Sequence, residues 1–251
     1  NMIVAPSDHL ITNEDEFVKV VNDGMSMTVE NDILLTIGIQ PSRPDTGYGY
    51  IQFNEHPLES NTTIKKVKTF TEKPNQELAL QFLDSGDFLW NSGIFIWSAK
   101  SITLAYRKYL HDMYAVFEEG KQYYNTNKEA EFIARVFPGC KNISIDYGIM
   151  EKADCVYVYP ADFGWSDLGT WGSLYTHLDL DKSRNAVQGN KVLLYDSADN
   201  IVKMPHDKVA VLHGLNGYIV VENDGTLLVC KKEDEQKIKQ FVLDVKKKTN
   251  N

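Results

Sequence analysis

The sequence predicts an α/β fold for its first 180 residues, followed by a small all-β unit. An apolar run at residues 2–8, MIVAPSD, precedes a helical pattern that starts at Asn13, and a second apolar run, DILLTIGI, occupies 32–39. The order strand, helix, strand is typical of a βαβ unit. After residue 185, short apolar segments recur about every nine residues, which is typical of β-strands joined by tight turns. We therefore expect two domains, residues 1–180 and 185–251.

The elements of the first domain follow from apolar spacing and from proline, glycine and asparagine positions. The opening run is expected to be a buried strand that pairs in parallel, because it is continuously apolar. We expect further strands in 50–53, 64–73, 88–98 and 155–160, and helices in 13–29, 75–83, 99–138, 144–153 and 171–178. Residues 162–171, DFGWSDLGTW, are expected to form a loop.

The second domain is expected to contain five strands and a closing helix. The strands are KVLLYD, NIVKM, KVAVLHG, GYIVVE and TLLVC, and Asn-Asp-Gly at 223–225 is typical of a hairpin turn. Residues 233–248 form an amphipathic pattern that ends in three lysines, 246–248. A helix C-terminus favours cations, so this run indicates a helix end rather than a nucleic-acid patch.

Composition excludes several classes of function. The chain has 251 residues, 43% of them hydrophobic, and a net charge of -9, which argues against non-specific binding of nucleic acid. No apolar run reaches the roughly 18 residues that a membrane span requires. The three cysteines are far apart and odd in number, so a disulfide framework is not expected. These features favour a cytoplasmic protein with no nucleic-acid or membrane partner.

Two carboxylates could bind a metal ion. Asp8 follows the first predicted strand, and in open α/β sheets ligands bind beyond the carboxyl ends of the strands. Asp167 lies in the predicted loop between Trp165 and Trp171. One or two carboxylates suit Mg²⁺, because phosphate oxygens can complete its coordination shell. The alternative for Asp8 is that it only caps a turn.

Three short motifs could bind a hydroxyl-rich or phosphorylated ligand. Gly47 in DTGYGY would let the backbone around Tyr48 approach a ligand, although a bent hairpin also explains the glycines. In TEKP, Glu72 could accept hydrogen bonds from hydroxyl groups and Lys73 could bind a phosphate, although such pairs are common on surfaces. In WNSG, Asn91 offers both donors and an acceptor, or it caps a turn.

These motifs occur together and in a specific order. PSDH, TGYGYI, FTEKP, LWNSGIF, SIDYGIMEK and GWSDLGTW follow one another over residues 2–178. In this the chain closely resembles the mannose-1-phosphate guanylyltransferase family. The resemblance implies a Rossmann-like nucleotidyltransferase fold of the glycosyltransferase-A type, with a mixed sheet. It also implies an enzyme that forms GDP-mannose and pyrophosphate from GTP and mannose 1-phosphate.

The resemblance also implies roles for individual residues. Asp8 and Asp167 would be the catalytic Mg²⁺ ligands. The substrate-binding residues would be Gly47, Tyr48, Glu72, Lys73, Asn91 and, supporting the sugar from behind, Asp146. In the reaction a phosphate oxygen of mannose 1-phosphate would attack the α-phosphorus of GTP in line. That oxygen is already anionic, so the reaction needs positioning and charge neutralisation more than a base.

The chain departs from the family at its beginning. Family members open with a glycine-rich GGxGxRLxPxSR loop that holds the GTP phosphates, and the sequence contains no such stretch. We therefore expect a nucleotidyltransferase domain that is incomplete at its N-terminus and inactive as this fragment alone. Two alternatives stay open: a nucleotidyltransferase for another sugar 1-phosphate or nucleotide, and a non-catalytic sugar-nucleotide-binding assembly subunit. Exposed strand edges in 185–251 also predict a homo-oligomer.

Overall fold

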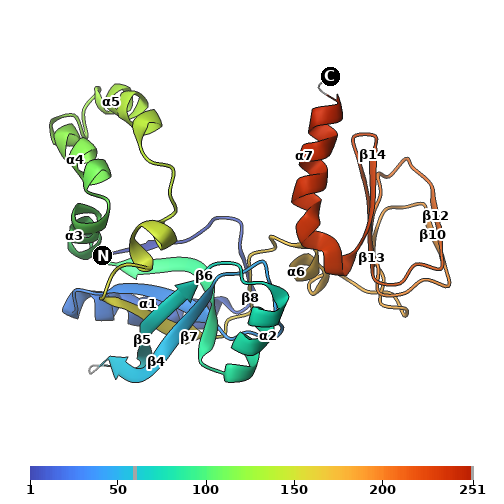
Figure 1. Cartoon of the computed structure of the whole chain (residues 1–251), viewed down its shortest axis with the longest axis horizontal. Coiled ribbons are helices and arrows are strands. Elements are labelled where there is room, and N and C mark those ends of the chain that lie inside the picture. Colours follow the sequence, from blue (N-terminus) through green and yellow to red (C-terminus); the bar gives the residue numbers. More distant parts are fainter. Residues whose placement is uncertain (59–60, 250–251) are drawn as a thin grey trace. The chain divides into compact units, whose positions relative to one another are not determined.

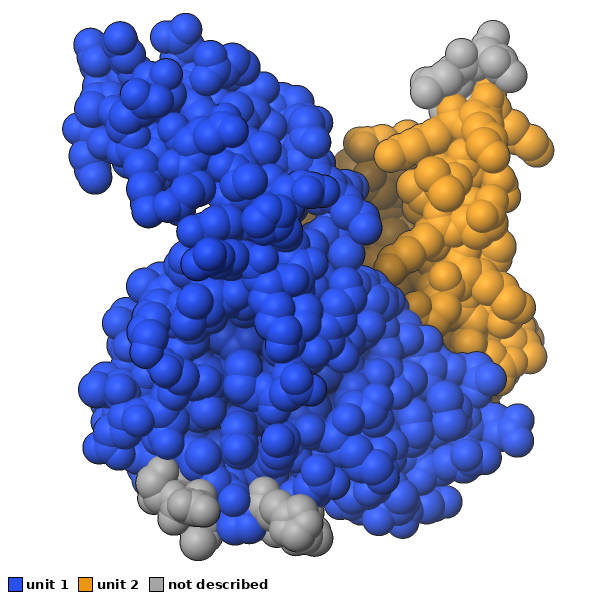
Figure 2. Space-filling model, turned by 60° about the vertical axis from the view of Figure 1, so that its left-hand side comes forward, with its two compact units in different colours: residues 1–7, 11–165 blue, residues 8–10, 166–251 orange. Residues whose placement is uncertain are grey.

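A computed structural model describes residues 1–58 and 61–249, which form two compact units (Figures 1 and 2). The first unit comprises residues 1–7 and 11–165, and the second comprises 8–10 and 166–251. The strands of the first unit are β1 (Met2–Val4), β3 (Leu34–Ile39), β4 (Tyr50–Leu58), β5 (Asn61–Thr71), β6 (Phe88–Trp97) and β7 (Val156–Ala161). Its α-helices are α1 (Glu14–Glu30), α2 (Gln76–Ser85), α3 (Ala99–Tyr109), α4 (His111–Glu119) and α5 (Glu129–Val136).

The first unit is built on a mixed six-stranded sheet with the strand order β1-β6-β3-β7-β5-β4. The strand β3 pairs in parallel with β7 and antiparallel with β6. All six residues of β3 are buried, as expected for a strand with a neighbour on each side and covered faces. The first residues of β6 also pair with β4. The predicted α/β class with a mixed sheet is therefore confirmed.

The prediction for the opening strand was wrong. Residues Met2–Val4 form β1, but β1 pairs antiparallel with β6, and its three side chains are 36% to 45% exposed. The exposure follows from its position: among residues 1–58 and 61–249, β1 lies at the edge of the sheet and pairs with β6 alone. A continuous apolar run does not by itself distinguish a central strand from an edge strand.

The first two helices begin next to the expected residues, Asn13 and Asn75, but the long helical stretch is divided. The side chain of Asn13 accepts a hydrogen bond from the Glu16 amide at 3.1 Å, and Asn75 caps α2 in the same way. Residues 99–138 form α3, α4 and α5 with 3₁₀ turns at Gly120–Gln122 (η1) and Phe137–Gly139 (η2). The expected short helix in 144–153 is a π-helical turn, η3 (Asp146–Met150).

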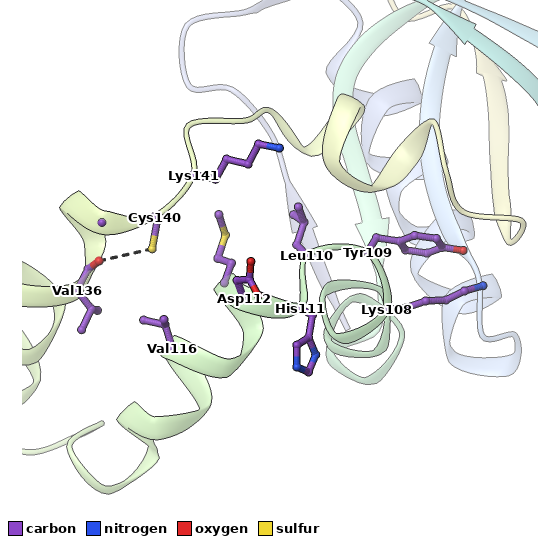
Figure 3. A pocket seen from close by; sticks show the side chains of 11 residues that line it. Lys108, Tyr109, Leu110, His111, Asp112, Val116, Val136, Cys140 and Lys141 are labelled. Atoms are coloured by element: carbon purple, nitrogen blue, oxygen red, sulfur yellow. Dashed lines mark hydrogen bonds between the residues drawn. The ribbon is translucent and has the colours of Figure 1, made fainter.

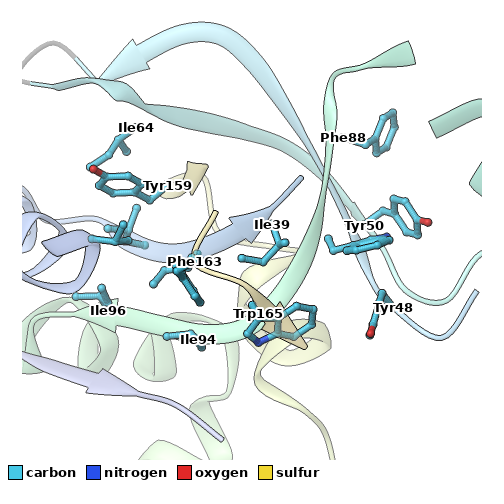
Figure 4. Packing of buried hydrophobic residues seen from close by; sticks show 14 of the residues in the cluster. Ile39, Tyr48, Tyr50, Ile64, Phe88, Ile94, Ile96, Tyr159, Phe163 and Trp165 are labelled. Carbon is cyan, nitrogen blue, oxygen red and sulfur yellow. The ribbon is translucent and has the colours of Figure 1, made fainter. Parts of the chain in front are cut away.

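The main core of the first unit lies between the sheet, α1 and the segment that follows β7. Tyr50, Ile64, Ile96 and Phe163 are completely buried in it (Figure 4). Tyr48 and Trp165 belong to the same cluster, with ring centroids 5.3 Å apart. This core therefore reaches the loop that carries Gly47 and Tyr48, and it holds that loop against the end of the sheet.

The second unit contains stacked parallel strands in addition to the predicted hairpin. Its elements are α6 (Trp171–Tyr175), β9 (Ala186–Gln188), β10 (Val192–Tyr195), β11 (Ile201–Lys203), β12 (Ala210–His213), β13 (Tyr218–Asn223), β14 (Thr226–Lys231), η4 (Lys232–Lys237) and α7 (Ile238–Thr249). The strands β9, β11 and β13 stack in parallel, and β10 stacks in parallel on β12. The turn at 223–225 joins β13 to the antiparallel strand β14. The closing helix begins at Ile238, after a 3₁₀ turn.

Two buried asparagines connect successive coils of the second unit. Asn200 is fully buried, and its amide nitrogen donates to Asn185 Oδ1 and to the Leu215 carbonyl, each at 2.9 Å. Its side-chain oxygen accepts from the Tyr218 amide at 2.8 Å. These bonds satisfy backbone groups at the corners between strands. Spacing of apolar residues alone did not reveal this parallel stacking.

Candidate functional site

The site begins at a bulge in β6. Between Thr36 and Gly38 of β3 the register with β6 shifts, because extra residues at Ser92–Gly93 interrupt the ladder. Gly93 has a φ of +69°, a left-handed conformation that favours glycine. The Ser92 hydroxyl donates to the Ile37 carbonyl at 2.6 Å and accepts from the Ile94 amide at 3.2 Å. The sequence Asn-Ser-Gly thus builds a bulge that sets the direction of Asn91.

Asn91 and Glu72 lie side by side because residue 49 has no side chain. A Cβ atom at Gly49 would be 2.6 Å from Glu72 Oε2 and 3.6 Å from Asn91 Cβ. The backbone N–H of Asn91 donates to the backbone carbonyl of Gly49 at 2.8 Å, which holds the backbones of the two motifs together. Glu72 in turn forms an ion pair with Lys73, which is half-exposed. The structure therefore brings together residues of DTGYGY, TEKP and WNSG.

The π-helical turn adds a carboxylate to this group. Asn91 Nδ2 donates to Asp146 Oδ1 at 2.9 Å. Burial raises the pKa of Asp146, and the negative charge of Glu72 raises it further, against the effects of the Asn91 hydrogen bond and of Lys73. The pKa of Glu151 is also raised, by desolvation and by the charges of Asp146 and Glu72. Acidic oxygens, one amide and one ammonium group thus share a small region of the first unit.

The loop before β4 is held by a second set of contacts. The guanidinium of Arg43 donates to Asp45 Oδ2 at 2.8 and 3.1 Å and lies 5.2 Å from the centroid of the Trp90 ring. Asp45 Oδ1 accepts the Gly47 amide N–H at 2.7 Å. The Tyr48 ring is 4% exposed and packs 4.9 Å from Trp90. Tyr48 is a packing residue of this loop, so it can offer a ligand little of its ring surface.

The two expected metal ligands lie at the same end of a small antiparallel ladder. The strands β2 (Leu10–Ile11) and β8 (Trp165–Ser166) are neighbours. The amides of Thr12 and Asn13 donate to the carbonyls of Gly164 and Phe163 in that order, so the two segments run in opposite directions. The residues before β2 and after β8, Asp8 and Asp167, therefore lie at the same end.

Both carboxylates have the chemistry that a hard cation requires. Asp8 is exposed, and within residues 1–58 and 61–249 its side chain makes no hydrogen bond or ion pair. Asp167 Oδ1 accepts the Gly169 amide N–H at 2.8 Å, which leaves lone pairs on both of its oxygens. Among the described residues, no group of three or more His, Cys, Asp and Glu side chains is arranged so that it could hold a metal ion. A metal ion here would use two protein carboxylates, a set that fits Mg²⁺ with phosphate and water oxygens.

A pronounced hollow lies away from these residues. It has a volume of about 520 Å³ and is lined by the end of α3, the start of α4 and the segment after α5 (Figure 3). Leu110, Val116 and Val136 form apolar parts of its wall, and Lys141 stands at its edge. None of the predicted site residues lines it, so it contributes nothing to the candidate site.

Sequence reasoning did not identify several residues of this arrangement. Thr36, Arg43, Asp45 and Glu151 contact or influence predicted residues but were not named. A signal existed for two of them: Thr36 is the one hydroxyl residue in the buried run LLTIGI, and Glu151 belongs to SIDYGIMEK. Arg43 and Asp45 act through the local turn, which spacing does not disclose.

Comparison with known proteins gives the chain relatives along most of its length. Residues 1–184 match the model of the nucleotidyl transferase family, and residues 189–244 match that of the MannoseP isomerase/GMP-like beta-helix domain. The chain is 34% identical over 248 residues to "Mannose-1-phosphate guanylyltransferase 2" of Escherichia coli O157:H7, covering 96% of the chain and 50% of the relative. It is also 34% identical over 252 residues to a mannose-1-phosphate guanylyltransferase of Salmonella montevideo, covering 98% and 52%.

A solved structure shows the same fold. The crystal structure described as mannose-1-phosphate geranyltransferase from Thermus thermophilus superposes with a TM-score of 0.79 at 27% identity, covering 97% of this chain and 69% of that one. The chain spans about half the length of the curated relatives it matches. Among the described residues, no helix is long and apolar enough to cross a membrane.

Proposed function

The chain belongs to the nucleotidyl transferase family, and from this premise we propose that it forms the mannose 1-phosphate- and metal-binding part of an enzyme that makes GDP-mannose and pyrophosphate from mannose 1-phosphate and GTP. The observation that supports this most is the group formed by Gly49, Glu72, Asn91 and Asp146. These residues come from four separate sequence motifs, yet they present carboxylate and amide groups within one small region. Such groups bind sugar hydroxyls.

Each residue of the group has a proposed part in binding. Glu72 accepts hydrogen bonds from sugar hydroxyls, and Asn91 binds a neighbouring hydroxyl. Lys73, whose ammonium group is half-exposed, binds the phosphate of the sugar phosphate as a point charge. Gly47 and Gly49 allow the ligand to approach the backbone. Tyr48 contributes by holding this loop in place through its packing on Trp90.

The proposed reaction is an in-line displacement at the α-phosphorus of the nucleotide. The attacking phosphate oxygen is already anionic, so the side chains are required to position the sugar phosphate and to neutralise charge. Asp8 and Asp167 are the proposed magnesium ligands. The ion, when bound, would supply positive charge to the phosphate oxygens. A cytoplasmic location and a homo-oligomer remain proposals, and the free thiols of Cys140, Cys155 and Cys230 agree with a reducing compartment.

Two measurements on the full-length product of the encoding reading frame test the activity. The first is pyrophosphate release from mannose 1-phosphate and GTP, compared with release when ATP, UTP or dTTP replaces GTP. Release with GTP but with none of the other three nucleotides supports guanylyl transfer. The second repeats the assay with Asp8→Asn and Asp167→Asn, which should each lower kcat at least about 100-fold. The exposed variant Glu119→Gln is the control. Equal activity with another nucleotide, or full activity of both aspartate variants, would refute this part of the proposal.

A further inference from the structure

The amide of Asn91 is fixed in one orientation by the chain itself. The backbone N–H of Gly93 donates to Asn91 Oδ1 at 3.2 Å, and Asn91 Nδ2 donates to Asp146 Oδ1 at 2.9 Å. A backbone N–H can only donate. If the amide were reversed, its NH₂ group would face this N–H and its carbonyl would face a carboxylate oxygen. Both contacts would then be lost, so the observed orientation is the only one that satisfies the neighbours.

A third group, on the neighbouring strand β3, reaches the side-chain carbonyl of Asn91. Thr36 lies on β3 and is fully buried, although an apolar β-branched residue would fit this strand equally well. Its hydroxyl Oγ1 is 3.3 Å from Asn91 Oδ1 and 3.3 Å from the Ile94 carbonyl. A buried hydroxyl is costly unless it is hydrogen-bonded. Its single proton therefore has two possible acceptors, of which one belongs to the candidate site.

We infer that Thr36 is a positioning residue whose hydroxyl, together with the Gly93 amide, occupies both lone pairs of the Asn91 carbonyl. Asp146 takes one proton of the Asn91 amide, so a single N–H remains for a ligand. The sugar hydroxyl that meets Asn91 must therefore act as an acceptor. The adjacent hydroxyl, beside Glu72, donates a hydrogen bond to the carboxylate. The inference rests on the proposed function, because it takes a sugar phosphate as the ligand.

Three variants separate this role from a purely structural one. Thr36→Val removes the hydroxyl but keeps the shape of the side chain and its preference for a strand. Thr36→Ser restores a hydroxyl. Thr28→Val is the matched control, because Thr28 is a buried threonine of α1 whose hydroxyl donates to the Met25 carbonyl.

The first measurement follows the side-chain amide of Asn91 by ¹⁵N–¹H NMR, with its signal assigned by its loss in Asn91→Asp. We expect Thr36→Val to move or broaden this signal, and Thr36→Ser and Thr28→Val to leave it near its wild-type position. If the Thr36 proton instead serves the Ile94 carbonyl, Thr36→Val will leave the Asn91 signal unchanged. That result would overturn the inference whatever the ligand is.

The second measurement is the affinity of the 251-residue chain for mannose 1-phosphate and its 2-, 3-, 4- and 6-deoxy analogues. We expect Thr36→Val to lower the affinity for mannose 1-phosphate about 5- to 10-fold. The affinity of Thr36→Ser should stay within about 2-fold of the wild-type value. Wild type should lose affinity for the analogue that lacks the Asn91-facing hydroxyl, whereas Thr36→Val should bind that analogue and mannose 1-phosphate alike. Unchanged discrimination in Thr36→Val would contradict the inference. Failure of the wild-type chain to bind mannose 1-phosphate would refute the proposed substrate, while the NMR signal still decides the role of Thr36.

Discussion

At the scale of single residues, the absence of one side chain creates the candidate sugar site. Glu72 and Asn91 both approach the position that a Cβ atom of residue 49 would occupy. The space beside Gly49 is therefore available to a ligand only while no side chain stands there. The nearest atom is the end of the flexible Glu72 side chain, so an added methyl group would displace Glu72 rather than disturb the sheet.

Gly49→Ala should for this reason weaken sugar-phosphate binding without unfolding the chain. We expect the affinity for mannose 1-phosphate to fall at least about 10-fold, because a Cβ atom 2.6 Å from Glu72 Oε2 would push the carboxylate out of place and weaken its hydrogen bonds to the ligand. The melting temperature should change little. Gly139→Ala is the control, since a Cβ atom at Gly139 meets nothing within 4 Å. Unaltered affinity in Gly49→Ala, measured by titration calorimetry, would rule out the space beside residue 49 as the ligand site.

Asp146 should make stability depend on pH in the acidic range. Burial and the charge of Glu72 raise its pKa in the folded state above the ordinary value of 3.8. The folded state therefore binds the proton more tightly, and the stability contributed by that proton is lost as the pH rises from about 4 through the raised pKa. Asp146→Asn removes this dependence. In urea unfolding at several pH values, the variant should gain stability relative to wild type as the pH rises, and a constant difference would contradict the assignment.

At the scale of elements, the ladder between β2 and β8 positions the two proposed metal ligands. Gly164, just before β8, has a φ of +65°, and a Cβ atom there would lie 1.8 Å from Thr12 Oγ1. The Thr12 side chain thus fills the place that a side chain at residue 164 would need, and the left-handed backbone there favours glycine. Because Asp8 and Asp167 both extend from the same end of this ladder, their separation depends on its pairing.

Gly164→Ala should therefore impair both stability and metal binding. The left-handed backbone and the contact with Thr12 together predict a loss of about 1–3 kcal/mol in the free energy of unfolding. We also expect weaker binding of Mn²⁺, used as a paramagnetic substitute for Mg²⁺, in relaxation measurements. Gly139→Ala again serves as the control. A variant that unfolds more readily but binds Mn²⁺ as wild type does would show that the ladder does not set the metal site.

The sequence predicted elements better than it predicted their neighbours. Caps at Asn13 and Asn75, the strands around Asn91 and the hairpin turn at 223–225 follow from local chemistry, which spacing and residue type record. The exposed edge position of β1 depends instead on strand order, which no local pattern contains. For the same reason Glu72 and Asn91 could be predicted from their motifs, whereas Thr36 was missed. Thr36 contacts Asn91 from the neighbouring strand, β3.

At the scale of the whole molecule, the two units have separate cores and should respond separately to substitution. The second unit depends on buried amide contacts as well as on Ile201 and Ile219. Asn200→Ala removes the acceptor of the Tyr218 amide and should destabilise this unit by about 2–4 kcal/mol. In calorimetric melting, only the transition of the second unit should shift to lower temperature. The affinity for mannose 1-phosphate should be retained. The exposed Asn190→Ala is the control, and a parallel loss of sugar-phosphate binding would contradict separate units.

The measurement that tests the central claim most directly is titration calorimetry of mannose 1-phosphate into the 251-residue chain. It is made on wild type, Glu72→Gln, Asn91→Ala and the exposed control Glu119→Gln, with glucose 1-phosphate and free mannose as competing ligands. We predict saturable binding of mannose 1-phosphate by wild type and by the control, and a loss of at least about 10-fold in the other two variants. Equal affinity in all four proteins, or no binding by folded wild type, would contradict the assignment of this site.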